Sequence, residues 1–262
     1  MTTEAGGDGA PHLVLVHGQG SAATYWDNVV GTLAGPYRVT VVDLPGHGPG
    51  ARRLTVAEAA PARLAEALVE QLEERGIDRP HLVGLSLGGW VVLEAAARGY
   101  GASVTALAPA GLWAPGAPVR REREVSNFRH LVVALRPALP WLTTRSTVRR
   151  FGLRLNVAHP ERVTPAQLLA AAHALAQAKA YTACDRAAVR ARFEGAARVT
   201  VPCTVAFGDA DRVLDAESSQ NRALAPPGAD WVVVPDCGHA MSWDQPDICV
   251  ELIRATTARA GA

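Results

Sequence analysis

A chain of 262 residues can form one large α/β domain or two small ones, and 48% hydrophobic residues are enough for a substantial core. The formal net charge of +1 gives no general attraction to nucleic acid or to membrane surfaces, and no hydrophobic run approaches the roughly 20 residues of a membrane-spanning helix. The four cysteines form no C-x-x-C pair and no zinc spacing, so we expect neither a metal nor a disulfide framework. The N-terminus lacks the pattern of a signal peptide, and we expect a cytoplasmic protein.

Short hydrophobic runs alternate with segments of helical periodicity over most of the chain. Residues 1–10 are small and polar, and we expect them to be disordered. Strands are predicted at 12–17, 37–43, 80–83, 103–108, 199–207 and 231–234, and helices at 25–30, 55–75, 89–97 and 247–258. This alternation predicts an α/β fold with a mostly parallel, doubly wound sheet of about six strands, flanked by helices.

The alternation breaks after Trp113, where the chain reads Trp-Ala-Pro-Gly-Ala-Pro. Residues 119–193 contain no convincing strand, and Thr164-Pro165-Ala166-Gln167 is a strong helix start with proline at the first helical position. We therefore predict a helical lid (cap) over residues 115–197, inserted after the fourth strand. The core is then formed by residues 11–114 and 198–262.

The sequence Gly84-Leu85-Ser86-Leu87-Gly88 lies where a predicted strand turns directly into a helix. The two glycines leave room for the crossing, and Ser86 is expected to have a strained backbone that exposes its hydroxyl group. The unpaired N–H groups and the positive dipole end of the following helix lie beside it. This is the G-x-S-x-G pattern of a nucleophile elbow, although a tight crossing with an incidental serine has the same pattern.

A serine nucleophile needs a base that takes its proton and an acid that orients the base. His239 follows the strand at 231–234, and both Asp209 and Asp211 follow the strand at 199–207. Asp211 is the preferred acid because it lies deeper in its loop, whereas Asp209 is suited to capping the turn. Asp236 is a weaker rival because it is close in sequence to His239. The sequence thus predicts Ser86, Asp211 and His239 in this order as the catalytic residues.

The oxyanion of a tetrahedral intermediate needs two backbone N–H donors. Leu87 offers one directly after the nucleophile, and Gln19 offers the other in the glycine-rich loop after the first strand. The alternative for this loop is a flexible strand–helix connection. Ser21, Trp26 and Trp113 are assigned to the substrate pocket, with simple packing as the alternative for the tryptophans. His47 is interpreted as a structural turn residue.

Together these motifs resemble the α/β-hydrolase superfamily, and within it the small serine esterases, lactonases, cofactor-free haloperoxidases and carbon–carbon bond hydrolases. The resemblance covers residues 11–114 and 198–258. It implies Ser86 as nucleophile, His239 as base, Asp211 as acid, and Gln19 and Leu87 as the oxyanion hole, with no cofactor. Serine instead of aspartate at the elbow argues against the epoxide hydrolase and haloalkane dehalogenase branches. The family usually begins with an antiparallel pair of strands, and the ten residues before Pro11 are too few to supply one.

The balanced net charge hides an uneven distribution. Residues 119–192 hold thirteen arginines and one lysine against four acidic residues, a balance of +10, so the rest of the chain carries −9. A basic lid over an acidic body attracts an anionic substrate, such as a carboxylate-bearing ester, a thioester of coenzyme A or an acidic carrier protein. The alternative is that the arginines merely solvate the outer faces of the lid helices. No basic stripe interleaved with aromatic residues indicates nucleic-acid binding.

The sequence therefore predicts a serine hydrolase that cleaves an ester, thioester or lactone of a small molecule through an acyl-enzyme. Two alternatives remain open. The same triad can serve a carbon–carbon bond hydrolase or a non-hydrolytic biosynthetic enzyme, and the same scaffold can serve a ligand-binding receptor.

Overall fold

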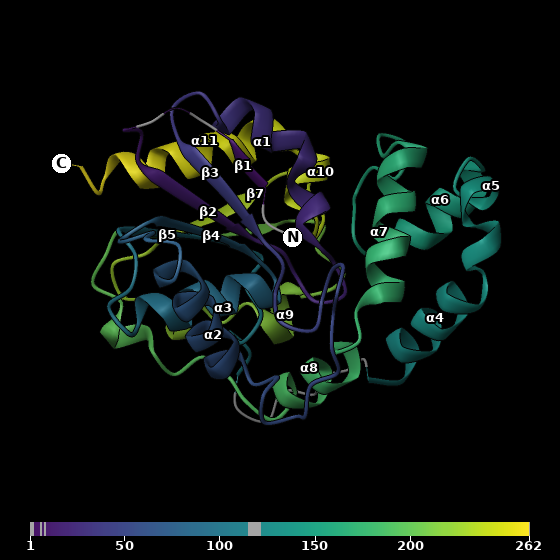
Figure 1. The fold of residues 1–262 in the computed structure, drawn as a ribbon, viewed down its shortest axis with the longest axis horizontal. Coiled ribbons are helices and arrows are strands. Elements are labelled where there is room, and N and C mark those ends of the chain that lie inside the picture. The colour runs from purple at the N-terminus through teal and green to yellow at the C-terminus, as the bar shows by residue number, and fades with distance from the viewer. Residues whose placement is uncertain (1–2, 6, 8, 115–121, 262) are drawn as a thin grey trace.

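The structure, a computed structural model, describes residues 3–5, 7, 9–114 and 122–261. Its centre is a seven-stranded sheet in the order β1-β3-β2-β4-β5-β6-β7 (Figure 1). The six strands from β2 to β7 are all parallel, as the sequence predicted. The strands are β1 (Thr3–Ala5), β2 (His12–Val16), β3 (Arg38–Val42), β4 (His81–Leu85), β5 (Ser103–Leu107), β6 (Cys203–Gly208) and β7 (Asp230–Val234).

The edge strand β1 differs from the expectation that residues 1–10 are disordered. Its three residues pair antiparallel with β3, with Thr3 opposite Val41 and Ala5 opposite Val39. In a sheet of six strands, the N–H and C=O groups along the outer edge of β3 would have no partner strand. β1 supplies that partner. A strand of three residues is too short to show an alternating pattern in the sequence, which is why it was not predicted.

The strand order reverses beside β2, and this reversal decides where a site can form. After β2 the chain adds β3 on one side, then returns across β2 to place β4 on the other. The loops that leave β2 and β4 therefore diverge at their carboxyl ends. Such a switch point is where open α/β sheets bind ligands, and the predicted Gln19 and Ser86 both follow it directly.

Helices cover both faces of the sheet (Figure 1). One face carries α1 (Asp27–Leu33) and α11 (Pro246–Ala258), and the other carries α2 (Pro61–Glu73) and α3 (Leu87–Ala96). The buried side chains of both layers form one hydrophobic cluster with the strands. Two short helices, α9 (Ala216–Ser219) and α10 (Met241–Asp244), lie in loops that follow β6 and β7.

The helix predicted from Thr55 begins later, at Pro61. The side-chain bonds of a capping box form at Thr55: its Oγ1 accepts from the N–H of Glu58 at 3.2 Å, and its N–H donates to the Glu58 carboxylate at 2.8 Å. They close a turn instead of a helix. Proline disfavours helical backbone in the residue before it, and Ala60 is indeed extended, with ψ at 136°. The helix therefore starts with Pro61 at its first position.

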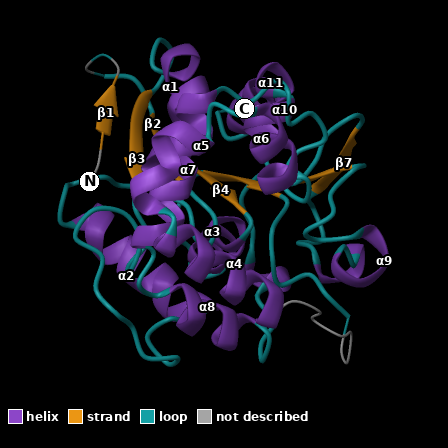
Figure 2. Ribbon diagram, turned by 90° about the vertical axis from the view of Figure 1, so that its right-hand side faces the viewer, coloured by secondary structure: helices purple, strands orange, loops and turns teal. Residues whose placement is uncertain are grey.

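Between β5 and β6, the described residues 122–197 form five α-helices, and we call this range the helical insertion (Figure 2). The helix predicted to start at Thr164 is confirmed, since Thr164 and Gln167 form a full capping box at the start of α7. Four buried side chains, Val132, Leu139, Ala172 and Ala176, give the insertion a small core of its own. The helices are α4 (Glu122–Ala134), α5 (Leu139–Leu142), α6 (Ser146–Leu153), α7 (Pro165–Gln177) and α8 (Tyr181–Ala188).

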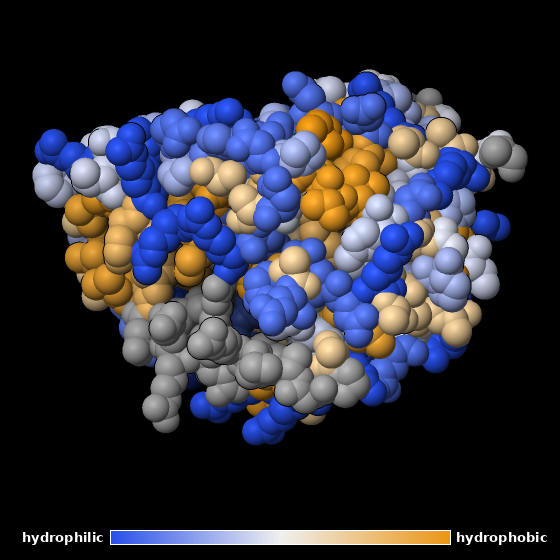
Figure 3. Space-filling model, turned by 180° about the vertical axis from the view of Figure 1, so that it is seen from behind, coloured by the Kyte–Doolittle hydropathy of each residue, from blue (hydrophilic) through white to orange (hydrophobic). Residues whose placement is uncertain are grey.

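The outer surface of the insertion carries hydrophobic side chains beside hydrophilic ones (Figure 3). Trp141 and Phe151 are 58% and 61% exposed. Arg145 lies over the Trp141 ring at 4.5 Å and Arg154 over the Phe151 ring at 4.1 Å, which are cation–π distances. Among the helices that the structure describes, none is both long and apolar enough to cross a membrane.

Candidate active site

Ser86 occupies the sharp turn between β4 and α3, with φ at 55° and ψ at −117°. A serine with positive φ is strained, and the surrounding backbone holds it in place. Its N–H donates to the Leu107 carbonyl at 2.9 Å, and its own carbonyl accepts from the N–H groups of Trp90 and Ala110, both at 3.0 Å. The strand–turn–helix context that the G-x-S-x-G pattern requires is therefore present.

The glycines at the elbow are required by close backbone contacts. A Cβ atom at Gly84 would overlap the backbone of Gly88, and one at Gly88 would lie 2.5 Å from the carbonyl oxygen of Val16. Any side chain at these positions would push α3 away from β2 and β4. The two glycines thus let the helix start directly above the strand ends.

The loop after β2 lies against the elbow. A Cβ atom at Gly18 would sit 3.1 Å from Ser86 Cβ, so the main chain passes closely beside the serine. The N–H of Ser21 closes a turn on the Gly18 carbonyl at 3.2 Å, with Gln19 inside it. Leu87 is the first residue of α3, where N–H groups have no partner within the helix. Of the predicted donors, Leu87 therefore follows Ser86 directly on α3, and Gln19 follows Gly18 in the loop that passes beside the serine.

His239 and Asp211 form a buried pair. The Nδ1 atom of His239 lies 2.8 Å from Oδ2 of Asp211, and both side chains are almost fully buried. The other carboxylate oxygen, Oδ1, accepts the N–H groups of Val213 and Leu214 at 2.8 and 2.9 Å. Because a carboxylate only accepts, Nδ1 carries the proton of this bond, and in the neutral tautomer of the ring Nε2 of His239 is the acceptor.

The rival acids have other partners. Asp209 accepts the backbone N–H of Cys237 at 3.3 Å and holds the loop after β7 to the loop after β6. Asp236 is exposed, and its Oδ1 lies 2.7 Å from Nε2 of His159, whose pKa it raises by favouring the protonated ring. The hydrogen bond to the predicted base is therefore made by Asp211.

The loop that carries His239 is fastened to the helical insertion by a buried carboxylate that the sequence analysis missed. Asp244 accepts three backbone N–H groups, from Gly238 and Ala158 at 2.8 Å and from His159 at 3.0 Å. The N–H of Ala240 also donates to the Asn156 carbonyl at 2.7 Å. The available signal was an aspartate five residues after the predicted base.

Two buried histidines connect the loops after β2 and β3. His17 donates from Nδ1 to the Gly18 carbonyl at 2.7 Å and accepts the Leu44 N–H on Nε2 at 3.1 Å, so its ring is neutral, and burial lowers its pKa. His47 donates to the Pro45 carbonyl at 3.2 Å, 5.4 Å from His17 between ring centroids, and burial lowers its pKa to about 3. Both rings thus support the loop that carries Gln19.

The residues assigned to the pocket have packing contacts. Trp26 is fully buried and meets Tyr25 edge-on at 4.8 Å. Trp113 packs edge-on against Trp90 at 5.4 Å and donates to the Ala191 carbonyl at 2.9 Å. Ser21 is partly exposed beside Gln19. Packing explains the tryptophans, and a pocket role for the three predicted residues stays a prediction.

All four cysteines are free and buried, and burial raises the pKa of every thiol. They are Cys184, Cys203, Cys237 and Cys249. Within the described ranges, no group of three or more His, Cys, Asp or Glu side chains is placed to hold a metal ion.

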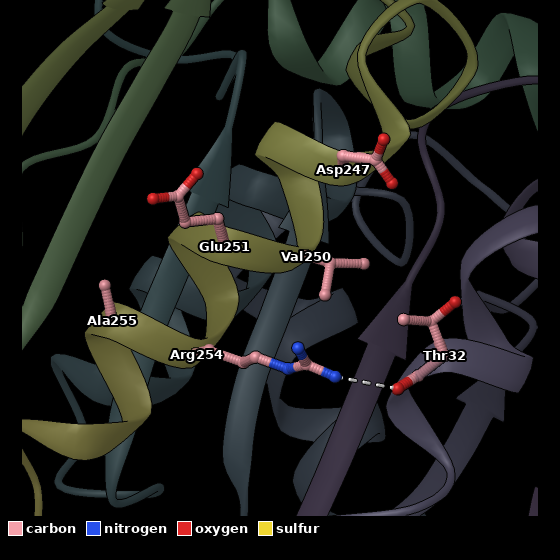
Figure 4. A pocket seen from close by; sticks show the side chains of 6 residues that line it. All are labelled: Thr32, Asp247, Val250, Glu251, Arg254 and Ala255. Atoms are coloured by element: carbon pink, nitrogen blue, oxygen red, sulfur yellow. Dashed lines mark hydrogen bonds between the residues drawn. The ribbon is translucent and has the colours of Figure 1, made fainter.

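A groove lies between α1 and α11 (Figure 4). Arg254 crosses it and donates to the carbonyl of Thr32 at 3.1 Å. None of the predicted site residues lines it, and we assign it no role in catalysis. Its lining residues are Thr32, Asp247, Val250, Glu251, Arg254 and Ala255.

A strained serine at a strand–helix turn and a histidine–aspartate pair on later loops of one parallel sheet are the features of a hydrolase. The profile of the alpha/beta hydrolase family matches residues 13–252, and the chain belongs to this family.

The relatives of this chain include several proteins named as hydrolases. The chain is 31% identical over 198 residues to the epoxide hydrolase EphH of Mycobacterium tuberculosis, an alignment that covers 73% of this chain and 92% of that protein. It is 26% identical to 3-oxoadipate enol-lactonase 1 of Acinetobacter baylyi, over 94% of this chain and 88% of that one. Several further curated relatives match over only 24% to 36% of their own length.

Solved structures share the whole fold. The enol-lactonase from Burkholderia xenovorans LB400 superposes with a TM-score of 0.77 at 22% identity, covering 98% of this chain and 96% of that chain. This likeness concerns the architecture.

Proposed function

We propose that the protein is a serine hydrolase that cleaves an ester, thioester or lactone of a small molecule through Ser86, His239 and Asp211. The observation that carries this proposal is the buried 2.8 Å bond between His239 and Asp211, which leaves Nε2 of the imidazole as a base. The positive φ of Ser86, which is typical of the serine in a nucleophile elbow, also supports the proposal. The names of the ester- and lactone-cleaving relatives agree with this chemistry.

In the proposed acylation step, Nε2 of His239 takes the proton from Ser86 Oγ as Oγ bonds to the substrate carbonyl carbon. The carbonyl electrons move onto oxygen, and the N–H groups of Gln19 and Leu87 stabilise that negative charge. When the tetrahedral intermediate collapses, the bond to the leaving alcohol or thiol breaks. The leaving group takes the proton from His239, whose positive charge the Asp211 carboxylate stabilises meanwhile.

In the proposed second half, water replaces the leaving group. His239 removes one proton from the water while its oxygen bonds to the acyl carbon. Collapse of the second intermediate releases the carboxylic acid and returns the proton to Ser86 Oγ. Because every proton passes through His239, these steps need no cofactor.

A serine nucleophile favours acyl substrates over epoxides, although one relative is named an epoxide hydrolase. Attack of Ser86 Oγ on an epoxide carbon would form an ether, which has no carbonyl carbon for water to attack. An ester or lactone instead gives an acyl-enzyme that water cleaves. We therefore place acyl transfer ahead of epoxide opening for this chain.

We propose that the helical insertion acts as a lid over this site. The Gln19 side chain donates to the Tyr181 carbonyl at 3.0 Å, and a Cβ atom at Gly20 would lie 2.8 Å from the Tyr181 ring. The N–H of Ala180 donates to the Gly46 carbonyl at 3.1 Å. The start of α8 is thus held against the loop beside Ser86.

A burst assay with p-nitrophenyl acetate tests acyl-enzyme formation. The intact protein is expected to release one equivalent of nitrophenol rapidly, and Ser86→Ala is expected to abolish the burst. Ser146→Ala removes an exposed hydroxyl at the start of α6 and serves as a matched control that keeps the burst. Absence of a burst from the intact protein, or cleavage of a vinylogous diketone while simple esters stay intact, would overturn the proposal.

A further inference from the structure

A second cavity lies at the boundary between the core and the helical insertion, lined by residues 53–56, by α4 and by α8 with the residues just before it. Its volume is about 440 Å³, within the range of small-molecule sites. Five basic residues and no acidic residue are among those that line it. The lining residues are Arg53, Leu54, Thr55, Val56, Arg129, His130, Lys179, Thr182, Ala183 and Arg186.

Three of the basic side chains that line this cavity have no ion-pair partner among the residues that the structure describes. Arg53, Lys179 and Arg186 form no ion pair with any carboxylate of the described part of the chain. The neighbouring Arg52, by contrast, pairs with Glu58 at 2.9 Å. Like charges that converge without a counter-ion repel one another, and a bound anion would relieve that repulsion.

One cation of the cavity is fixed in place. The Arg129 guanidinium donates to the carbonyls of Leu175 and Ala176 at 3.2 Å each, at the last turn of α7. The side chain is half-buried, so it is already ordered before any ligand binds. A preorganised arginine loses less conformational entropy on binding an anion than a free surface side chain would.

The number and kind of the basic groups indicate the ligand. A single carboxylate would neutralise only one of them. Phosphate and diphosphate groups carry several charged oxygens, and the planar fork of arginine matches their geometry. The hydrophobic side chains of Leu54, Val56 and Ala183 in the same cavity suit an organic group attached to the phosphate.

The cavity adjoins the proposed active site through one short segment. Lys179, Thr182 and Ala183 line the cavity, while Tyr181, between them, accepts the bond from Gln19 through its carbonyl. The loop of Gln19 passes beside Ser86. Residues 179–183 therefore line the cavity and also contact the loop that passes beside Ser86.

We propose that this cavity binds the phosphate or diphosphate group of a substrate whose acyl bond is cleaved at Ser86, such as an acyl thioester of a nucleotide-bearing carrier of the coenzyme A type. The inference rests on the proposed function for the reaction at Ser86. Anion binding itself does not depend on that reaction, so the two can fail separately.

Isothermal titration of the full chain with adenosine 3′,5′-bisphosphate and with pyrophosphate tests the binding. Saturable 1:1 binding that weakens with salt is expected. Loss of one hydrogen bond to a charged group raises the dissociation constant about tenfold or more. The double variant Lys179→Ala/Arg186→Ala should therefore bind each probe about a hundredfold more weakly. Arg150→Ala removes one exposed charge from α6, outside the cavity, and should leave binding within about twofold.

A kinetic comparison connects the cavity to the substrate. The intact protein should hydrolyse an acyl-coenzyme A with a KM at least tenfold below that of the same acyl group on N-acetylcysteamine, which has no phosphate. Lys179→Ala/Arg186→Ala should abolish this preference. A preference that survives the double substitution would overturn the inference.

Three other binding results would overturn it as well: no saturable binding of either phosphate probe, equally tight binding of glutarate, or an equal loss in Arg150→Ala. Binding of an acidic carrier protein without binding of the small phosphates would also refute it. A normal nitrophenol burst without phosphate binding removes only this inference. Phosphate binding without a burst removes only the proposed function.

Discussion

Replacing Asp211 by Asn tests whether Asp211, and not Asp209, is the acid that orients the predicted base His239. In the native protein, Oδ2 accepts from His239 while Oδ1 accepts two backbone N–H groups. The asparagine oxygen must keep the backbone position, because its amide N–H₂ would meet two other donors there. The amide therefore faces the imidazole and donates to Nδ1. The ring then carries its proton on Nε2, where it cannot accept the proton of Ser86.

The size of the effect follows from this change of tautomer. In triads of this kind the wrong tautomer costs roughly 10³- to 10⁴-fold in rate, or about 4 to 5.5 kcal/mol of transition-state stabilisation. The fold should remain intact, because both backbone bonds to residue 211 persist. Asp209→Asn is the matched control, since it changes only the 3.3 Å bond to the Cys237 N–H.

The assay is kcat/KM for a p-nitrophenyl ester, measured for the two variants and the native chain, with circular dichroism as the check on folding. Asp211→Asn should lose at least a thousandfold and Asp209→Asn less than about tenfold. The reasoning is refuted if the folded Asp211→Asn variant stays within tenfold of the native protein. It is also refuted if Asp209→Asn loses as much.

Three further changes test the supports of the site. Burial lowers the pKa of His47 from 6.5 to about 3, so below pH 6.5 the unfolded chain binds a proton that the folded chain does not. The free energy of unfolding should therefore fall by about 2 kcal/mol between pH 7 and pH 5. A His47→Gln variant whose urea titrations keep the full native pH dependence would contradict this. Gly88→Ala places a Cβ 2.5 Å from the Val16 carbonyl oxygen and should lower the free energy of unfolding by about 3 kcal/mol or more. The control Gly31→Ala, with open space around it in α1, should raise it by up to about 1 kcal/mol in the same denaturation experiment. Equal effects of the two substitutions would argue against the close approach at Gly88. Asp244→Ala leaves three N–H groups without their acceptor, so it should lower the free energy of unfolding by about 2–5 kcal/mol and speed proteolysis near residues 156–162. Asp244→Asn should have a smaller effect. An unchanged melting temperature of Asp244→Ala would show that the carboxylate does not fasten this loop.

The parts of the fold that the sequence predicted are those with local signals. Each parallel strand is a hydrophobic run, and Ser86, Asp211 and His239 each follow one, so the strand pattern alone brings them to one edge of the sheet. The preference for Asp211 over Asp209 rested on its position deeper in the loop, and the observed bond to His239 agrees with it.

The parts that were missed depend on contacts between distant segments. β1 exists only because the edge of β3 offers it partners, and three residues hold no pattern of their own. The tie made by Asp244 joins α10 to residues 86 positions away, which no local rule detects. At Thr55 the capping-box bonds form, but Pro61 disfavours helical backbone in the residue before it, so the helix starts later than predicted.

The buried, weakly acidic thiols have a practical consequence. With all four native cysteines shielded and their pKa values raised, the folded protein should react slowly with maleimide and iodoacetamide reagents. One cysteine introduced on an exposed turn of α6 would then be the site of labelling. A fluorophore attached there would report, without removal of any native residue, whether the inserted helices shift when a substrate arrives.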